Sequence, residues 1–267
     1  MMVGVRPTAR KDVRAMSQGR GVLEGAFLVL EELGRLGEAG LSQLTVATGL
    51  PKTTTHRLLE QLVRLGAINR DTGGRYRVGT RSFQLGQLWQ PGPVLRTAAA
   101  QPLRRLAAAT GGSVSLGISD AVGIMIVAGV IGEVEEVFSL RPGAVLPPAS
   151  AAEVVMATSV PGATVPDGYS AIEWRRRIIS ARDHGVAIDY EVDAAPVGCV
   201  AAPVHAPTGA VVAAVGIAVF DKRRLPSMGD AVREIAGQVS VNLSRIPHAG
   251  RALSGLATPA AGESDRD

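Results

Sequence analysis

Apolar residues recur at helical spacing in three stretches within the first 80 residues. Over residues 21–36 the expected inward face consists of Leu23, Ala26, Phe27, Leu30 and Leu33. A second stretch starts near Ser42, which we expect to be the N-cap of a helix that turns Leu44 and Ala47 inward. A third begins at Pro51, after Gly49 has allowed a tight turn. This order predicts one helix followed by a helix–turn–helix.

The helix from Pro51 changes character along its length. It starts with Lys, three Thr, His and Arg, and it then carries an apolar stripe of Leu58, Leu59, Leu62, Val63 and Leu65. The apolar stripe must be buried in a core, whereas the polar, cationic start can stay in contact with solvent. We therefore expect the start of this helix to lie on DNA and its end to be buried in a small domain.

Alternating residues follow in "AINRDTGGRYRVG", residues 67–79, around an Asp-Thr-Gly-Gly turn. This pattern predicts a β-hairpin, and the whole order predicts a winged helix–turn–helix. A helical hairpin that only packs against another element is the alternative. The residues expected to contact DNA are Ser42, Lys52, Thr53, Thr54, Thr55, His56 and Arg57, with Arg70, Arg75 and Arg77 on the wing. Thr55 could instead pack inward.

Beyond the wing the pattern predicts a linker helix and a second domain. Residues 88–111 have helical spacing around Pro102, with Leu95, Leu103, Leu106 and Ala107 facing a partner or the following domain. Residues 113–140 read as three short strands. Helices are expected at 150–160, with Ser150 as cap, at 170–185, with Ile172, Ile178 and Ile179 inward, and at 226–246. Three more strands are expected between 186 and 220.

Strands with helices on one face predict an α+β effector domain. The expected organisation has two folded domains: residues 1–19 a flexible basic arm, 20–87 the DNA-binding domain, 88–111 the linker helix, 112–246 the effector domain and 247–267 a disordered tail.

Charge supports the DNA-binding interpretation of the N-terminal part. Residues 1–80 contain 12 Lys and Arg against 7 Asp and Glu, whereas the rest contains 16 against 17. A basic head on a neutral body is typical of a DNA-binding protein, although a basic solvated surface would give the same counts. Cys199 is the single cysteine, and no apolar run reaches the roughly 18 residues that span a membrane. We expect a cytoplasmic protein without membrane contact.

Four blocks in order resemble the IclR family of bacterial transcription regulators over about residues 20–246. They are the helix–turn–helix at residues 41–71, the wing "GRYRVGTRSFQLG", then "LRPGAVLPPASAA" and "HGVAIDYEVDAAPVGCVAAPVHAPTGAVVAAVGIAV". The resemblance implies a winged helix–turn–helix, a linker helix and a GAF-like, mixed α/β effector-binding domain. It also implies dimers through the N-terminal domains, tetramers through the C-terminal ones, and small organic acids or aromatic compounds as effectors.

The family's effector pocket maps onto Ala151, Ala152, Asp189, Val197, Cys199, Gly216 and Ala218. Two positions that are often Ser in members that bind small carboxylates are Gly216 and Ala218 here, and a family Gly-Lys pair is Glu153 and Val154. A buried carboxylate needs donors. The effector is therefore a larger, less polar molecule, or its anion is held by backbone N–H groups where the Ser150 helix starts, or the pocket binds nothing.

Other chemistry finds little support in the sequence. Cys199 lies in an apolar run, so a small buried side chain is a better interpretation than a nucleophile assisted by His205 and Asp189. No two histidines have metal-ligand spacing, and no phosphate-binding loop is present. We expect no enzyme activity, no metal and no cofactor.

The expected function is that of a dimeric or tetrameric regulator that binds a near-palindromic operator in double-stranded DNA and responds to a small effector. The alternatives are a ligand-insensitive regulator and an enzyme with a basic appendage.

Overall fold

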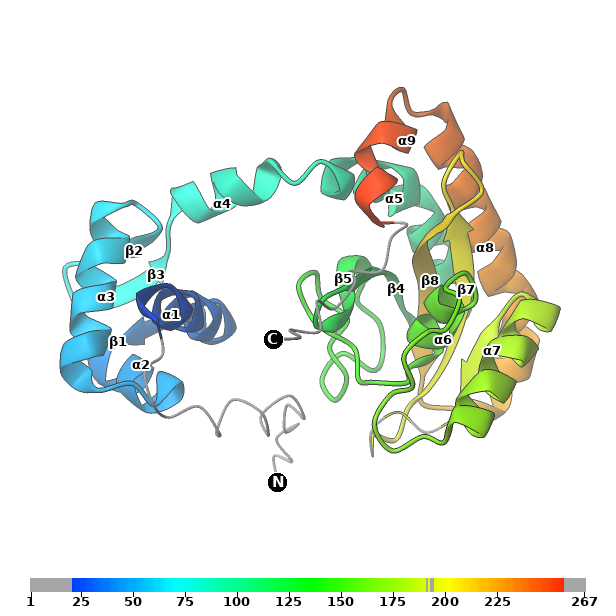
Figure 1. The fold of residues 1–267 in the computed structure, drawn as a ribbon, viewed down its shortest axis with the longest axis horizontal. Helices are drawn as coiled ribbons and strands as arrows, with labels where there is room; N and C mark the ends of the chain where they lie inside the picture. Colours follow the sequence, from blue (N-terminus) through cyan, green and yellow to red (C-terminus); the bar gives the residue numbers. More distant parts are fainter. Residues whose placement is uncertain (1–20, 191, 193–194, 257–267) are drawn as a thin grey trace, which may run out of the picture. The chain divides into compact units, whose positions relative to one another are not determined.

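A computed structural model describes residues 21–190, 192 and 195–256. These residues form two compact units that divide between Trp89 and Gln90, and each unit has its own core (Figure 1). The predicted basic arm lies outside the described residues, as does the part of the predicted tail from 257 onward.

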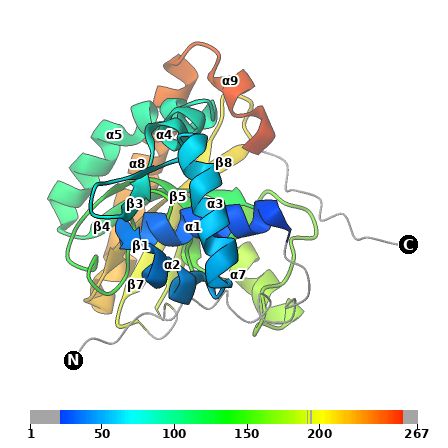
Figure 2. The ribbon, with the colours of Figure 1, turned by 90° about the vertical axis from the view of Figure 1, so that its left-hand side faces the viewer.

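The N-terminal unit combines four helices with a small sheet (Figures 1 and 2). Its helices are α1 (Val22–Leu36), α2 (Leu41–Thr48), α3 (Lys52–Arg64) and α4 (Thr80–Gln87). The predicted hairpin is confirmed as β2 (Ile68–Arg70) and β3 (Arg75–Val78), and β1 (Glu38–Gly40) pairs with the other edge of β3. The sequence pattern does not predict β1, because a three-residue strand between glycines is too short to show alternation.

The predicted inward face of α1 is wrong at two of its five positions. Leu33 is buried, and Ala26 and Leu30 are half-buried against the core, whereas Leu23 is 78% exposed and Phe27 is 65% exposed. The unpredicted Gly25 and Val29 are buried in their place. Gly25 explains the rotation of the helix, because a Cβ at this position would lie 3.0 Å from the Leu58 side chain of α3. Because Gly25 has no side chain, α1 and α3 can approach closely at this face. A pattern of large apolar residues does not reveal such a face.

The predicted cap of α2 is also wrong. The helix begins at Leu41 with Gly40 as its N-cap, and Ser42 lies exposed within the first turn. The Gln43 side chain accepts a 3.0 Å hydrogen bond from the Gly40 backbone N–H. The start of the helix is therefore closed by the Gln43 side chain at its third position rather than by a serine cap.

The C-terminal unit is built on a five-stranded antiparallel sheet in the order β5-β4-β8-β7-β6. The strands are β4 (Ser113–Asp120), β5 (Gly123–Val130), β6 (Ala187–Asp189), β7 (Gly198–His205) and β8 (Val211–Val219). The helices are α5 (Pro91–Thr110), α6 (Ala151–Ala157), α7 (Ala171–His184), α8 (Leu225–Arg245) and α9 (Ala249–Ala252), with short 3-10 turns at Lys222–Arg224 and Ser254–Leu256.

Helices cover both faces of this sheet rather than the predicted single face (Figure 1). α5 and α8 pack on one face, and α6 and α7 pack on the other. β8 explains the arrangement because eight of its nine residues are buried, so neither face of the strand can be left to water. Leu95, Leu103 and Leu106 bury α5 against its own domain, which is one of the two alternatives that the sequence left open.

Three further predictions in this unit are wrong. Residues 133–137 form turns rather than a third strand, and Glu135 accepts hydrogen bonds from Ser139, Leu140 and Arg141 there. Ile172 is 75% exposed and Ile179 is 46% exposed, because α7 buries Trp174 and Ala181 instead; Ile178 is half-buried against the core. Residues 249–256 form α9 and a 3-10 turn, with Leu253 buried in the core, so this part of the predicted tail is folded. Across the described ranges, no helix is both long and apolar enough to span a membrane.

Candidate nucleic-acid interface and ligand cavity

The polar start of α3 is presented to solvent in the N-terminal unit. Lys52, Thr53, His56 and Arg57 are exposed and Thr54 is half-buried. Leu58, Leu59 and Leu62 are buried on the opposite side, where α3 packs against α1 and α2. The turn before α3 depends on Gly49, which has a φ of 66°. The helix therefore has the two-part character that its sequence predicted.

Thr55 does not belong to this exposed set, which corrects one predicted DNA contact. Its side chain is completely buried, and its hydroxyl donates a 3.1 Å hydrogen bond to the Pro51 carbonyl oxygen. Position 55 points inward because it lies three and four residues before the buried Leu58 and Leu59. The inward alternative for Thr55 is therefore confirmed.

The three wing arginines are exposed, but each already has a partner. Arg75 Nε and Arg77 Nη2 each lie 3.1 Å from a carboxylate oxygen of Glu38 on β1. Arg77 also lies 3.5 Å from Asp71, and the Arg70 guanidinium lies 5.5 Å from the centre of the Tyr76 ring. Sequence reasoning missed Glu38, because its position opposite Arg77 follows from the unpredicted pairing of β1 with β3. Arg75 and Arg77 therefore share the face of the small sheet that carries Glu38, whereas Arg70 lies with Tyr76 on the other face.

A cavity lies in the C-terminal unit between α6 and the sheet. On the face of the sheet that α6 covers, the adjacent strands β4, β8 and β7 carry small residues in their middle. The helix therefore does not fill the space beneath it. The lining comprises Ser115, Gly117, Phe138, Leu140, Leu146, Ser150, Ala151, Ala152, Val192, Cys199, Val200, Ala201, Ala214, Gly216, Ile217 and Ala218. Its volume of about 20 Å³ is roughly what one or two water molecules require.

Five of the seven predicted effector residues line this cavity: Ala151, Ala152, Cys199, Gly216 and Ala218. Val197 is completely buried in the neighbouring apolar cluster with Val192 and Cys199. Asp189 is displaced from the lining, and its carboxylate lies 3.9 Å from the Arg177 guanidinium on α7. Sequence reasoning missed Ser115, on a strand, and Phe138, in a turn, although both line the cavity. No polar pattern marked the first residue, and no aromatic pattern marked the second.

Charges near the cavity are acidic. Burial and then the nearby Asp189 carboxylate raise the pKa of the Cys199 thiol to about 12, so the thiol is neutral near pH 7 and is not an activated nucleophile. Burial also raises the pKa of Glu153, although its hydrogen bond from the Ala149 N–H and the Arg177 charge oppose this. The Ser150 hydroxyl caps α6 as predicted by accepting a hydrogen bond from the Glu153 N–H.

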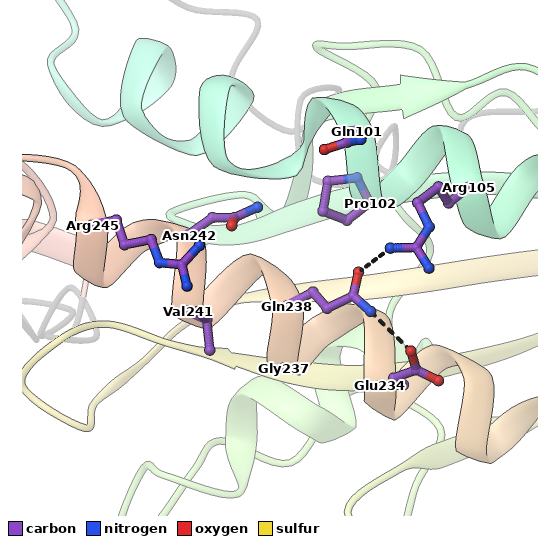
Figure 3. A pocket seen from close by; sticks show the side chains of 9 residues that line it. All are labelled: Gln101, Pro102, Arg105, Glu234, Gly237, Gln238, Val241, Asn242 and Arg245. Carbon is purple, nitrogen blue, oxygen red and sulfur yellow. Dashed lines mark hydrogen bonds between the residues drawn. The ribbon is translucent and has the colours of Figure 1, made fainter.

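A larger hollow of about 490 Å³ lies between α5 and α8 on the other face of the sheet (Figure 3). Six of its nine lining residues have polar side chains, and three of these bind one another. Arg105 donates a 3.1 Å hydrogen bond to Gln238, and Gln238 donates one of 2.9 Å to Glu234. Arg105, Gln238 and Glu234 already have partners within this groove, whereas the cavity under α6 has a mainly apolar lining and is the better candidate for a ligand.

Two family models match the chain. Residues 22–72 match the IclR helix-turn-helix domain, and residues 170–241 match the C-terminal domain of bacterial transcriptional regulators of the IclR type. The glycerol operon regulatory protein of Streptomyces coelicolor is 30% identical over 229 residues, which cover 76% of this chain and 88% of that protein. The HTH-type transcriptional repressor AllR of Escherichia coli is 24% identical and covers 91% of this chain and 94% of its own length.

Solved structures share the fold. The IclR protein of Thermotoga maritima has a TM-score of 0.64 at 21% identity, covering 83% of this chain and 98% of its own. An IclR homologue from Microbacterium hydrocarbonoxydans, complexed with 4-hydroxybenzoate, has a TM-score of 0.70 at 21% identity and covers 85% of this chain and all of its own. Both likenesses concern the fold of the chain.

Proposed function

Because the chain belongs to the IclR family of DNA-binding transcriptional regulators, we propose that it binds an operator through the start of α3 and represses transcription until a small effector enters the cavity under α6. The observation that carries this proposal is the exposed set Lys52, Thr53, His56 and Arg57 on a helix that is anchored by buried leucines. The name of the E. coli relative supports repression as the direction of control.

The DNA contacts divide by chemistry. Lys52 and Arg57 carry permanent positive charges and suit phosphate or guanine contacts, whereas Thr53 and His56 offer hydrogen bonds to base edges. Arg70, Arg75 and Arg77 of the wing suit the backbone or the minor groove beside α3. Ser42 at the start of α2 suits a phosphate, as an exposed hydroxyl near the same helix–turn–helix.

The protein acts as a dimer in this proposal. Exposed apolar side chains on α1 and near α4 support association of the N-terminal units; they include Leu23, Phe27, Phe83, Leu85 and Leu88. Such a concentration of exposed apolar groups is typical of an interface. A dimer places two α3 helices on the half-sites of a near-palindrome, and effector binding shifts the population that matches the half-site spacing.

A second candidate function is regulation without a ligand. The small volume of the cavity and the absence of hydroxyls at Gly216 and Ala218 favour it. Both candidates require operator binding, so the first test is common to them. The full chain should shift a labelled fragment of the DNA upstream of its own gene at a concentration that leaves a shuffled fragment unbound. Equal binding to both fragments would overturn the proposed operator.

A further inference from the structure

The lining of the cavity under α6 offers no positive charge. Among the residues that the structure describes, none that lines the cavity is Lys, Arg or His. An anion enclosed here would lose its hydration without gaining a compensating charge.

Two acidic groups next to the lining make an anion still less favourable. Asp189 is the register partner of the lining residue Cys199, and Glu153 follows the lining residue Ala152. The Arg177 guanidinium lies 3.9 Å from Asp189 and also acts on Glu153, so its charge is already opposed by two carboxylates. Both carboxylates would repel a bound organic acid.

One polar side chain faces the cavity with its hydrogen-bonding capacity unused. Ser115 on β4 is only 4% exposed, and its hydroxyl makes no hydrogen bond to any residue in the described part of the chain. Gly216 lies opposite on β8, where a Cβ would be 3.6 Å from the Ser115 oxygen. The missing side chain at position 216 therefore leaves the hydroxyl open to the cavity. The hydroxyl is therefore available to donate or accept a hydrogen bond with a molecule that enters the cavity.

We propose that this cavity selects a neutral, mainly apolar molecule that carries a hydroxyl group, and that Ser115 is the hydrogen-bonding partner of that group. The inference rests on the proposed function, since it names the class of effector for the same cavity. Apolar contacts come from Phe138, Leu140 and Leu146. A ring is larger than the present volume, so it enters by displacing these side chains of the segment between β5 and α6.

Isothermal titration of the full chain at pH 7.5 with phenol, toluene and benzoate tests this proposal. Phenol and toluene differ in the hydroxyl, and benzoate adds a negative charge to the same ring. We expect phenol to bind about three- to tenfold more tightly than toluene, as one net hydrogen bond provides, and benzoate to bind at least about tenfold more weakly than phenol. Ser115→Ala should remove the preference for phenol over toluene, whereas Ser119→Ala, on an exposed position of the same strand, should leave it intact.

Gly216→Val provides a second variant, because its methyl groups would occupy the space beside Ser115 and should abolish phenol binding. Benzoate binding as tightly as phenol would overturn the proposal, as would no binding of phenol up to about 10 mM, a concentration that detects even millimolar affinities. The same samples are assayed for specific operator binding. If that binding is intact while phenol fails, only the ligand class is wrong; if it is absent as well, the proposed function fails.

Discussion

The side-chain amide of Asn242 on α8 donates a 2.9 Å hydrogen bond to the carbonyl oxygen of Ala98 on α5. That carbonyl would normally accept from the backbone N–H of residue 102, but residue 102 is a proline inside the helix and has no N–H. Pro102 and Asn242 lie on facing helices beside the polar groove (Figure 3). The asparagine therefore satisfies a backbone group that the proline leaves unpaired, and it fastens α5 to α8.

This relationship predicts a coupling between two positions far apart in the sequence. Asn242→Leu should lower the free energy of unfolding by about 1–3 kcal/mol, the cost of a buried unpaired carbonyl. In a Pro102→Ala background the N–H is restored, so the same change should cost less than about 1 kcal/mol. Urea unfolding of the four proteins measures the coupling. Gln238→Leu on the same helix is the control, and an equal cost of Asn242→Leu in both backgrounds would show that the two residues act separately.

Glu38 limits the charge that the wing offers to DNA. Glu38→Gln should release Arg75 and Arg77 from their ion pairs, strengthen binding to DNA of any sequence and steepen its salt dependence. We expect about a three- to tenfold gain in affinity at low salt, measured by fluorescence anisotropy with operator and shuffled DNA. Glu31→Gln on α1 removes the same charge away from the wing and is the control. Weaker DNA binding by Glu38→Gln would mean that Glu38 positions the arginines rather than competing with phosphate.

The sequence predicted the DNA-binding fold better than it predicted the interior of the molecule. Helix spacing, Gly49 and the Asp-Thr-Gly-Gly turn act locally, so α2, α3 and the hairpin could be inferred from short windows. The inward face of α1 could not, since it depends on the close approach of Gly25 to Leu58. The same holds for Ser115 and Asp189, whose positions relative to the cavity depend on pairing between strands that are distant along the chain.

Glu153 predicts a pH dependence of stability. Its pKa is raised by burial, so the folded protein holds this proton more tightly than the unfolded chain, whose carboxyl pKa is near 4.5. Its contribution to stability is therefore present below the unfolded pKa and is lost as pH rises through the folded pKa. Glu153→Gln keeps an acceptor for the Ala149 N–H and should flatten this part of the stability profile. Urea midpoints between pH 4 and pH 7 would show it, and a profile identical to wild type would contradict the assignment.

The exposed apolar side chains of α1 and the α4 region predict a dimer that a charged substitution in this surface should dissociate. Phe27→Glu or Leu88→Glu should shift the sedimentation coefficient to that of a monomer and weaken operator binding, since a monomer contacts one half-site. Val46→Glu, at an equally exposed apolar position on α2, is the matched control. Retention of the dimer in both variants would place the interface elsewhere.

The most direct test of the proposed function measures operator affinity against salt concentration for wild type, Lys52→Ala, Arg57→Ala and Arg64→Ala. Lys52 and Arg57 lie at the exposed start of α3, whereas Arg64 lies in its last turn. We predict that the first two variants bind more weakly, with a salt slope reduced by about one for each phosphate that the missing cation no longer neutralises, and that Arg64→Ala stays close to wild type. Unchanged affinity in Lys52→Ala and Arg57→Ala, or an equal loss of affinity in Arg64→Ala, would contradict the assignment of α3 as the helix that reads DNA.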